Sequence, residues 1–192
     1  MYHPKKTTPA VIEFVDIAGL VKGASRGEGL GNKFLANIRQ THAIVHVVRC
    51  FDDENVIHVE GTTDPIRDID IIDLELIMAD VEMVERRIDK AQKAAKGDKK
   101  FLHEVDVFTG LLAWLNDGKS ARSYDCSEED RALIATSDLL TLKPVIYAAN
   151  LDEDGFSDYE NVDYYKRVEE RAKAEGAQVI PVCAKLEAEI AE

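Results

Sequence analysis

The sequence predicts an α/β protein with a doubly wound, mostly parallel sheet and an inserted antiparallel helical hairpin. Three observations support this prediction. Four short runs rich in β-branched residues alternate with helical segments, which is the pattern of parallel strands covered by helices. A long apolar stripe with heptad spacing lies between the second and third runs. A break at Gly97-Asp98 separates it from a second stripe, so the chain should reverse direction there.

The expected strands are short apolar runs without the alternation of a half-exposed strand. They span residues 11–15, 43–48, 144–149 and 178–182. Runs of this length and composition are typical of parallel strands that are buried on both faces. Helices are expected behind the first strand, at 32–41, and before the last strand, at 163–175, where Gly176 should end the helix.

The insertion is predicted from two helical stripes. The first stripe comprises Ile77, Val81, Val84, Ile88, Ala91 and Ala95, and the second comprises Leu102, Val105, Phe108, Leu112 and Leu115. Both follow the alternating steps of three and four that keep apolar residues on one side of a helix. The hairpin either contacts a partner or packs as a cap on the sheet, and the sequence favours neither alternative.

Composition limits the class of protein. The chain has 192 residues, of which 45% are hydrophobic and 32% are charged, as expected for one soluble domain with an insertion. We expect a cytoplasmic protein without a membrane partner, because no apolar run could span a bilayer and the first residues lack a secretory signal. The three scattered cysteines lack metal-ligand spacing and are expected to be reduced thiols.

The formal net charge of −13 argues against general DNA or RNA binding, which needs clustered Lys and Arg side chains. Any contact with RNA must therefore be local. The best local candidates surround the hairpin turn, although a solvated charged tip is the favoured interpretation. These candidates are Lys93, Lys96, Lys99 and Lys100.

An Asp-x-x-Gly motif, from Asp16 to Gly19, directly follows the first apolar run. In P-loop NTPases, such an Asp at the end of a buried strand holds the Mg²⁺ shell through water, and the Gly amide meets the γ-phosphate. The glycine-dense stretch 19–31 has the conformational freedom that a switch loop needs. The sequence therefore predicts a partial P-loop NTPase domain, with Asp16 as the metal residue and Gly19 as the γ-phosphate residue.

A base-reading motif is expected after the third run. Asn150 to Glu153 reads Asn-x-x-Glu where GTPases carry Asn-Lys-x-Asp. The shorter Asp suits guanine because its carboxylate accepts from two base N–H groups, so Glu153, with Leu151 in place of Lys, should relax discrimination and admit ATP beside GTP. The alternative, an Asx turn with solvent-facing acids, is disfavoured by the position behind a strand.

A second loop should meet the base after the last run. Pro181-Val182-Cys183-Ala184-Lys185 stands where such folds carry a Ser-Ala-Lys-like loop. Backbone amides do the binding in that loop, so a Cys in place of Ser is tolerable. The candidate nucleotide-binding residues of this loop are Cys183, Ala184 and Lys185.

The phosphate-binding loop is the missing part. Residues 113–120 satisfy a relaxed Walker A pattern, but we reject it because a helix precedes it and would direct carbonyl groups at the anion. The first strand, the phosphate loop and the first switch, all expected before Val11, are missing. The sequence therefore looks truncated at its amino end, and most triphosphate and Mg²⁺ contacts should be absent.

Together these motifs resemble the YchF family of Obg-like ATPases, in the Obg branch of the P-loop GTPases. The resemblance extends over nearly the whole chain and is most specific at residues 14–25, 27–32, 48–51 and 150–153. It implies a partial nucleotide-binding G domain of the Obg type at 1–66 and 137–192, with a coiled-coil insertion at 67–136. The family's carboxyl-terminal TGS domain has no counterpart here.

The resemblance also implies a catalytic residue. Active GTPases commonly place a water-orienting Gln after the Asp-x-x-Gly glycine, where this chain has Leu20. The family also lacks this Gln, and the residue proposed to replace its role is a histidine that matches His58. We expect His58 to orient water or to stabilise charge; the alternative is that it packs beneath the switch.

The resemblance implies a cytoplasmic, ribosome-associated ATPase that uses Mg²⁺ and ATP, or GTP, with the large ribosomal subunit as the expected partner. Because the phosphate loop is missing, the isolated chain is expected to be inactive. A second hypothesis is a binding fragment that hydrolyses nothing and contacts a ribosome or protein through its hairpin. A third is an incomplete gene model.

Overall fold

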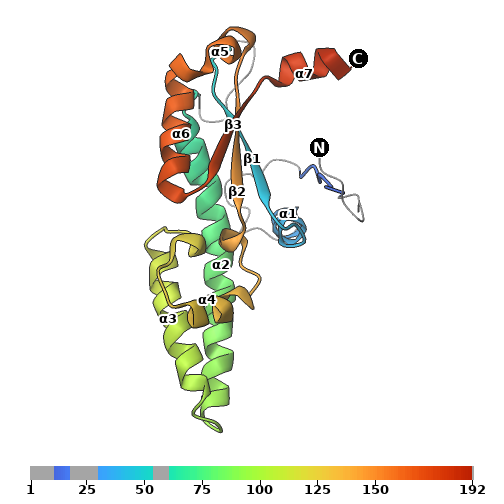
Figure 1. The fold of residues 1–192 in the computed structure, drawn as a ribbon. Helices are drawn as coiled ribbons and strands as arrows, with labels where there is room; N and C mark the ends of the chain where they lie inside the picture. The colour runs from blue at the N-terminus through green and yellow to red at the C-terminus, as the bar shows by residue number, and fades with distance from the viewer. Residues whose placement is uncertain (1–10, 18–29, 54–60, 192) are drawn as a thin grey trace, which may run out of the picture.

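The computed structural model describes residues 11–17, 30–53 and 61–191. A small sheet lies toward one end of an elongated molecule, and a helical hairpin extends from it toward the other end (Figure 1). The elements are α1 (Leu30–Arg39), β1 (Ile44–Arg49), α2 (Pro65–Ala95), α3 (Phe101–Asn116), η1 (Ala121–Ser123), α4 (Glu128–Ala135), η2 (Leu140–Leu142), β2 (Val145–Asn150), α5 (Glu153–Ser157), η3 (Tyr159–Asn161), α6 (Asp163–Glu175), β3 (Gln178–Val182) and α7 (Ala184–Ala191).

The sheet has the order β1-β2-β3, and both pairs of strands are parallel. Ile44 aligns with Val145, and Ile146 aligns with Gln178. Helices α2 and α6 cover one face, and the core between them and the strands is continuous. Its buried members are Val48, Cys50, Ile69, Val145, Tyr147, Ala149, Leu151, Tyr165, Val168 and Ala172. Three of the four expected strands are thus confirmed, within one residue of their expected limits.

The expected first strand is wrong. Residues 11–17 form no strand, and Val11 and Phe14 are 90% and 80% exposed. A parallel strand is stable only when a neighbour satisfies its backbone groups, and the described residues place no strand beside the outer edge of β1. The opposite face of the sheet is open as well, since the Val47 side chain is 65% exposed.

The expected helices are confirmed. Helix α1 starts two residues earlier than predicted, and α6 has the predicted limits, followed by Gly176 in the left-handed conformation at φ 67°. That φ is available to glycine without steric cost. Helix α2 begins after Asp64, whose carboxylate accepts from the amides of Ile66 and Arg67, satisfying two of the free N–H groups of the first turn.

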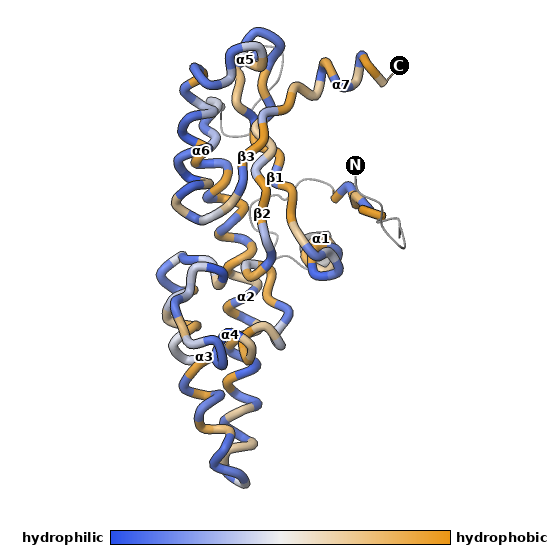
Figure 2. The backbone as a smooth tube through the Cα atoms, viewed as in Figure 1, coloured by the Kyte–Doolittle hydropathy of each residue, from blue (hydrophilic) through white to orange (hydrophobic). Residues whose placement is uncertain are grey.

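The hairpin forms as two antiparallel helices, α2 and α3, with the turn around Gly97 at its tip. The α2 stripe packs inward as expected, but the α3 stripe is only half right, because Leu102 is 49% exposed while Val107 and Leu111 are buried. Helix α3 also packs against α4 and η1, so its buried face is broader than a two-helix seam. The hairpin turn is hydrophilic (Figure 2).

Helix α2 is continuous from the sheet to the hairpin tip. It contributes Ile69 to the core of the sheet and Val84 to the core of the hairpin. The predicted domain limit at residues 66 and 67 therefore falls in the first turn of this helix, and it stays a prediction. Among the residues that the structure describes, no helix is long and apolar enough to cross a membrane.

Candidate functional site

Asn150 is the last residue of β2 and lies between the carboxyl ends of its two neighbours. It aligns with Arg49 on one side and with Val182 on the other. Its carbonyl oxygen accepts from the Cys50 amide at 2.8 Å, and its side-chain Oδ1 accepts from the Ala184 amide at 3.0 Å. The second bond ties the end of β2 to the first residue of α7, so the two loops expected to meet the base lie side by side.

An ion pair joins the same two loops. Lys185 Nζ lies 2.5 Å from Glu153 Oε1. The hydrogen bond and the charge of Glu153 raise the pKa of Lys185. Both side chains are exposed, at 71% and 45%, so a ligand at this edge could contact either group. The structure therefore brings together Asn150, Glu153, Ala184 and Lys185.

The Glu153 loop is held by a cap on α5. Asp152 Oδ1 accepts from the Gly155 amide at 2.8 Å. A Cβ on Gly155 would lie 2.7 Å from that oxygen and 3.4 Å from Val162 Cγ2, so a larger residue would displace the capping carboxylate. Glycine at this position thus permits the turn that presents Glu153.

Leu151 and Cys183 point into the protein. Their exposed fractions are 2% and 1%. Leu151 belongs to the core cluster that contains Val48 and Tyr165, and its amide donates to the Val182 carbonyl at 2.8 Å. Neither side chain is available to a ligand in this arrangement, so the nucleotide contacts predicted for these two residues are limited to their backbone.

Asp16 is exposed and is not brought to Asn150. The next residue, Ile17, packs against a core cluster that Ile44 also contacts. The buried members of this cluster are Leu35, Ile38, Leu76, Ala79 and Leu140. Ile44 starts β1, whereas Asn150 lies beside the end of that strand. Because residues 11–15 do not join the sheet, Asp16 is not carried to its carboxyl edge.

The two predicted catalytic residues, Gly19 and His58, lie outside the described residues. Their roles stay predictions, as does the water-mediated contact of Asp16 with Mg²⁺. The described ranges contain no group of three or more His, Cys, Asp or Glu side chains gathered as metal ligands.

The rejected Walker A pattern lies at the end of α3. The Asp117 amide donates to the Ala113 carbonyl and the Gly118 amide to the Leu115 carbonyl, so these N–H groups are occupied. Trp114 Nε1 donates to the Ser120 carbonyl at 3.1 Å, and Lys119 Nζ lies 4.3 Å from the centre of the Trp114 ring. The segment is a helix end and not a phosphate cradle.

One residue near this edge was not predicted as part of the site. Arg49 ends β1 beside Asn150. Its Nε donates to the Phe51 carbonyl at 2.9 Å, and its guanidinium lies 4.8 Å from the centre of the Phe51 ring. A charged residue at the end of an apolar strand is the sequence signal that could have identified it.

Comparison with known proteins identifies the family. The family model described as 50S ribosome-binding GTPase matches residues 2–151. The chain belongs to this family. Its resemblance to YchF proteins is also confirmed. It is 50% identical over 193 residues to the ribosome-binding ATPase YchF of Bacillus subtilis (strain 168), and 52% identical over 190 residues to that of Escherichia coli O157:H7.

These alignments cover 100% and 98% of this chain but 53% and 52% of the two relatives. The chain thus spans about half the length of the curated relatives it matches. The solved structure of the Schizosaccharomyces pombe YchF GTPase matches with a TM-score of 0.74 at 37% identity, over 89% of this chain and 47% of that chain. The α/β fold with a partial P-loop NTPase domain is therefore confirmed.

Proposed function

We propose that this chain forms the base-binding part of a ribosome-associated ATPase with relaxed base specificity. The observation that supports the proposal best is the joining of two loops at the carboxyl edge of the sheet by the Asn150–Ala184 hydrogen bond and the Glu153–Lys185 ion pair. Ligands of open parallel sheets bind at this edge. The names of the relatives, ribosome-binding ATPases, support the same function.

In this proposal Asn150 and Glu153 select the base. Glu153 offers an acceptor on a side chain one methylene longer than the Asp of GTPases. The motif position that holds Lys in GTPases is Leu151, whose side chain is buried. A site without the rigid pair of acceptors that guanine requires discriminates weakly against adenine. ATP is therefore the proposed substrate, with GTP accepted.

The hydrolytic step is proposed on the motifs alone. Mg²⁺, when bound, would neutralise charge on the phosphates. Asp16 would hold the metal through water, Gly19 would contact the γ-phosphate, and His58 would orient the attacking water. Residues 113–120 form a helix end and not a phosphate cradle, so from the described residues we expect nucleotide binding to be weak and turnover to be negligible.

Titration with a fluorescent ATP analogue tests the proposal. We expect the wild-type chain to bind and Asn150→Ala to bind about tenfold more weakly, because it loses a base contact and the bond that positions Ala184. Thr109→Ala is the control, since this exposed hydroxyl on α3 donates only to the Val105 carbonyl. Absence of binding by the wild-type chain, or equal affinities of the three proteins, would contradict the proposal.

A second candidate function is a ribosome- or protein-binding fragment that hydrolyses nothing. The extension of the hairpin away from the sheet favours it (Figure 1). Co-sedimentation of the chain with ribosomes in the absence of nucleotide, combined with failure to bind the ATP analogue, would favour this function over the first.

A further inference from the structure

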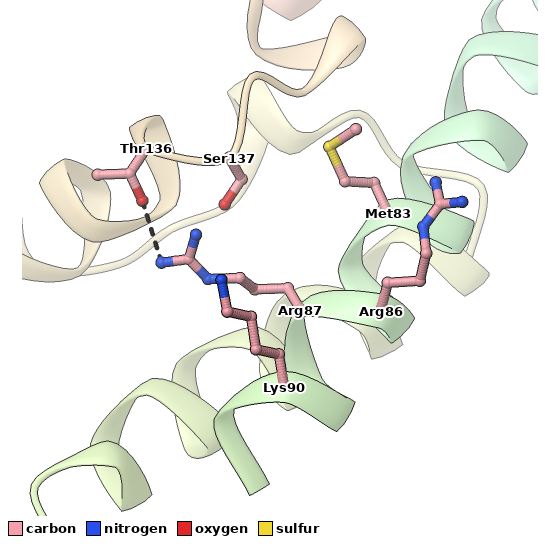
Figure 3. A pocket seen from close by; sticks show the side chains of 6 residues that line it. All are labelled: Met83, Arg86, Arg87, Lys90, Thr136 and Ser137. Carbon is pink, nitrogen blue, oxygen red and sulfur yellow. Dashed lines mark hydrogen bonds between the residues drawn. The ribbon is translucent and has the colours of Figure 1, made fainter. Parts of the chain in front are cut away.

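A pocket of about 240 Å³ lies on the hairpin, beside the junction of α4 and η2. Helix α2 supplies most of its wall, and the turn after α4 closes it (Figure 3). Its lining residues are Met83, Arg86, Arg87, Lys90, Thr136 and Ser137. Three of these six side chains are cations, in a chain with a formal net charge of −13, so the pocket is a local concentration of positive charge.

Two of the cations have no counter-charge. Arg86 and Lys90 are exposed, and within the described ranges neither makes an ion pair or a hydrogen bond through its side chain. They are four residues apart on α2 and so lie on the same side of the helix, where like charges repel. An anion between them would remove this repulsion.

A third cation is fixed in place and frames the pocket. The Arg87 side chain pairs with Glu104 and donates from Nη2 to Thr136 Oγ1 at 3.3 Å. Its guanidinium also lies 5.3 Å from the centre of the Phe108 ring. Arg39 reaches the margin, with Nη1 3.7 Å from Met83 Sδ, but the same nitrogen lies 4.0 Å from Asp80 Oδ1, so Arg39 is not counted among the cations free to bind an anion.

The Ser137 hydroxyl indicates the kind of ligand. Ser137 is 7% exposed, and its Oγ is buried without a hydrogen-bond partner. Figure 3 shows this hydroxyl turned toward Arg87 and Lys90. A buried hydroxyl without a partner costs free energy, and it can donate to an oxyanion that the surrounding cations also attract.

We propose that this pocket binds a phosphate group of an RNA backbone. Arg and Lys with a hydroxyl donor are the typical protein partners of backbone phosphates, and the ribosome-binding names of the relatives point to RNA as the source. The inference rests on the ribosome association proposed above but does not depend on nucleotide binding at Asn150. It assigns an RNA contact to the side of the hairpin, separate from the lysines of its tip.

Fluorescence anisotropy with a short labelled RNA hairpin tests this assignment on the whole chain. We expect Arg86→Gln/Lys90→Gln to bind the RNA about tenfold more weakly. The slope of log K against the logarithm of the salt concentration should be shallower by about one. Ser137→Ala should bind about threefold more weakly without a change in that slope, because it removes a donor but no charge. Arg87 is left unchanged because its contacts support the hairpin.

The matched control is Lys166→Gln/Lys173→Gln, which removes the same charge from α6. Unchanged circular dichroism of each variant establishes that it is folded. Equal losses in the pocket and control variants would overturn the proposal, since they would report net charge alone. Failure of the wild-type chain to bind the RNA hairpin would overturn it too, and so would pocket-dependent binding of inorganic phosphate without RNA binding.

Ribosome co-sedimentation separates this inference from the proposed function. If the wild-type chain and the Arg86→Gln/Lys90→Gln variant sediment with ribosomes equally well, the pocket assignment fails while ribosome association stands. If RNA-hairpin binding depends on the pocket but the chain does not sediment with ribosomes, the association fails and the phosphate site stands.

Discussion

Replacing Asp80 tests whether a buried carboxylate holds the hairpin to the sheet. Asp80 lies on α2 and is fully buried. Its carboxylate accepts from the amides of Leu140 and Thr141, both at 2.8 Å, and from Thr141 Oγ1 at 2.7 Å. Arg39 Nη1 lies 4.0 Å away. Because η2 leads directly into β2, this one side chain connects the long helix to the start of the central strand.

The expected loss of stability in Asp80→Ala follows from these contacts. Each of the three donors would lose a charged acceptor, which costs about 1.5–3 kcal/mol for an isolated bond. The bonds share one carboxylate, and burial raises its pKa by opposing the charged form, so the losses do not add in full. Removal of one partner from a buried charged network costs about 3–5 kcal/mol, or a melting temperature lower by about 10 °C for a chain of this size.

Urea unfolding at pH 7, followed by circular dichroism, measures the difference. Asp106→Ala is the control, because Asp106 is an exposed carboxylate on α3 and its loss should change stability by less than about 0.5 kcal/mol. If Asp80→Ala lowers the free energy of unfolding by less than about 1 kcal/mol, the carboxylate does not hold the junction and the reasoning fails.

Two further predictions concern side chains at the sheet, the half-buried His46 and the buried Leu151. Burial lowers the pKa of His46 to about 4, so the unfolded chain takes up this proton first as pH falls and stability is lost between about pH 6.5 and pH 4. Between pH 7 and pH 5, the free energy of unfolding should fall by about 2 kcal/mol less in His46→Leu than in the wild-type chain. Equal falls in the two proteins, measured by urea unfolding at both pH values, would count against this prediction. Leu151→Lys should destabilise the chain by about 3 kcal/mol or more, because it puts a charge into the core; an unchanged melting temperature would contradict this. Glu153→Asp alone is therefore the better probe of base preference, by competition between ATP and GTP.

Elements with local signals could be predicted from the sequence. Helix α6 has the limits that its pattern and Gly176 indicated, and three strands follow from continuous apolar runs. Burial on both faces is expected for all three, but only β2 is largely buried. The run at residues 11–15 has the same composition, yet it forms no strand. The composition of a segment indicates that it prefers to be buried, but a strand also needs a neighbouring strand to pair with. The residues of the run do not determine whether such a neighbour is present.

Likewise, only part of the candidate site could be predicted from the sequence. The proximity of Asn150 and Ala184 could be predicted because carboxyl ends of adjacent parallel strands share an edge. The burial of Leu151 follows from the strand period of two, since Ala149 and Leu151 lie on the same face and both are buried. It was not predicted, because Leu151 was interpreted only as part of the base-reading motif. The pocket around Ser137 could not be predicted, because α2 and the α4–η2 turn meet only in the folded chain.

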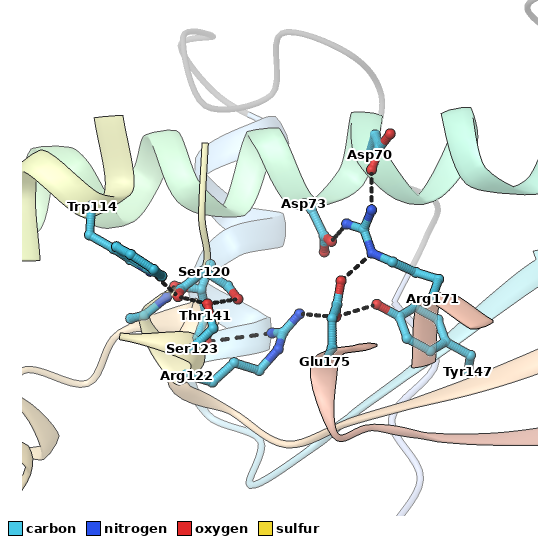
Figure 4. A network of polar contacts seen from close by, with 11 residues as sticks. Asp70, Asp73, Trp114, Ser120, Arg122, Ser123, Thr141, Tyr147, Arg171 and Glu175 are labelled. Atoms are coloured by element: carbon cyan, nitrogen blue, oxygen red, sulfur yellow. Dashed lines mark hydrogen bonds and ion pairs between the residues drawn. The ribbon is translucent and has the colours of Figure 1, made fainter. Parts of the chain in front are cut away.

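A second network shows why the two ends of the molecule should act as one body. Arg171 pairs with Asp70 and Asp73 of α2 and with Glu175 of its own helix (Figure 4). Glu175 also accepts from Tyr147 of β2 at 2.9 Å and pairs with Arg122 of η1. Burial raises the pKa of Asp73 to about 6 despite the opposing charges of Arg122 and Arg171, which is mainly the cost of removing this carboxylate from water.

This cost is offset by the number of elements that the network joins. Helices α2 and α6, strand β2 and η1 all contribute charged or polar groups to it (Figure 4), and Asp80 fixes the same helix to η2. Helix α2 is thus attached at two levels before it enters the hairpin. The base loops and the phosphate pocket lie on different parts of this frame without sharing a side chain, so substitutions at one should leave the affinity of the other unchanged.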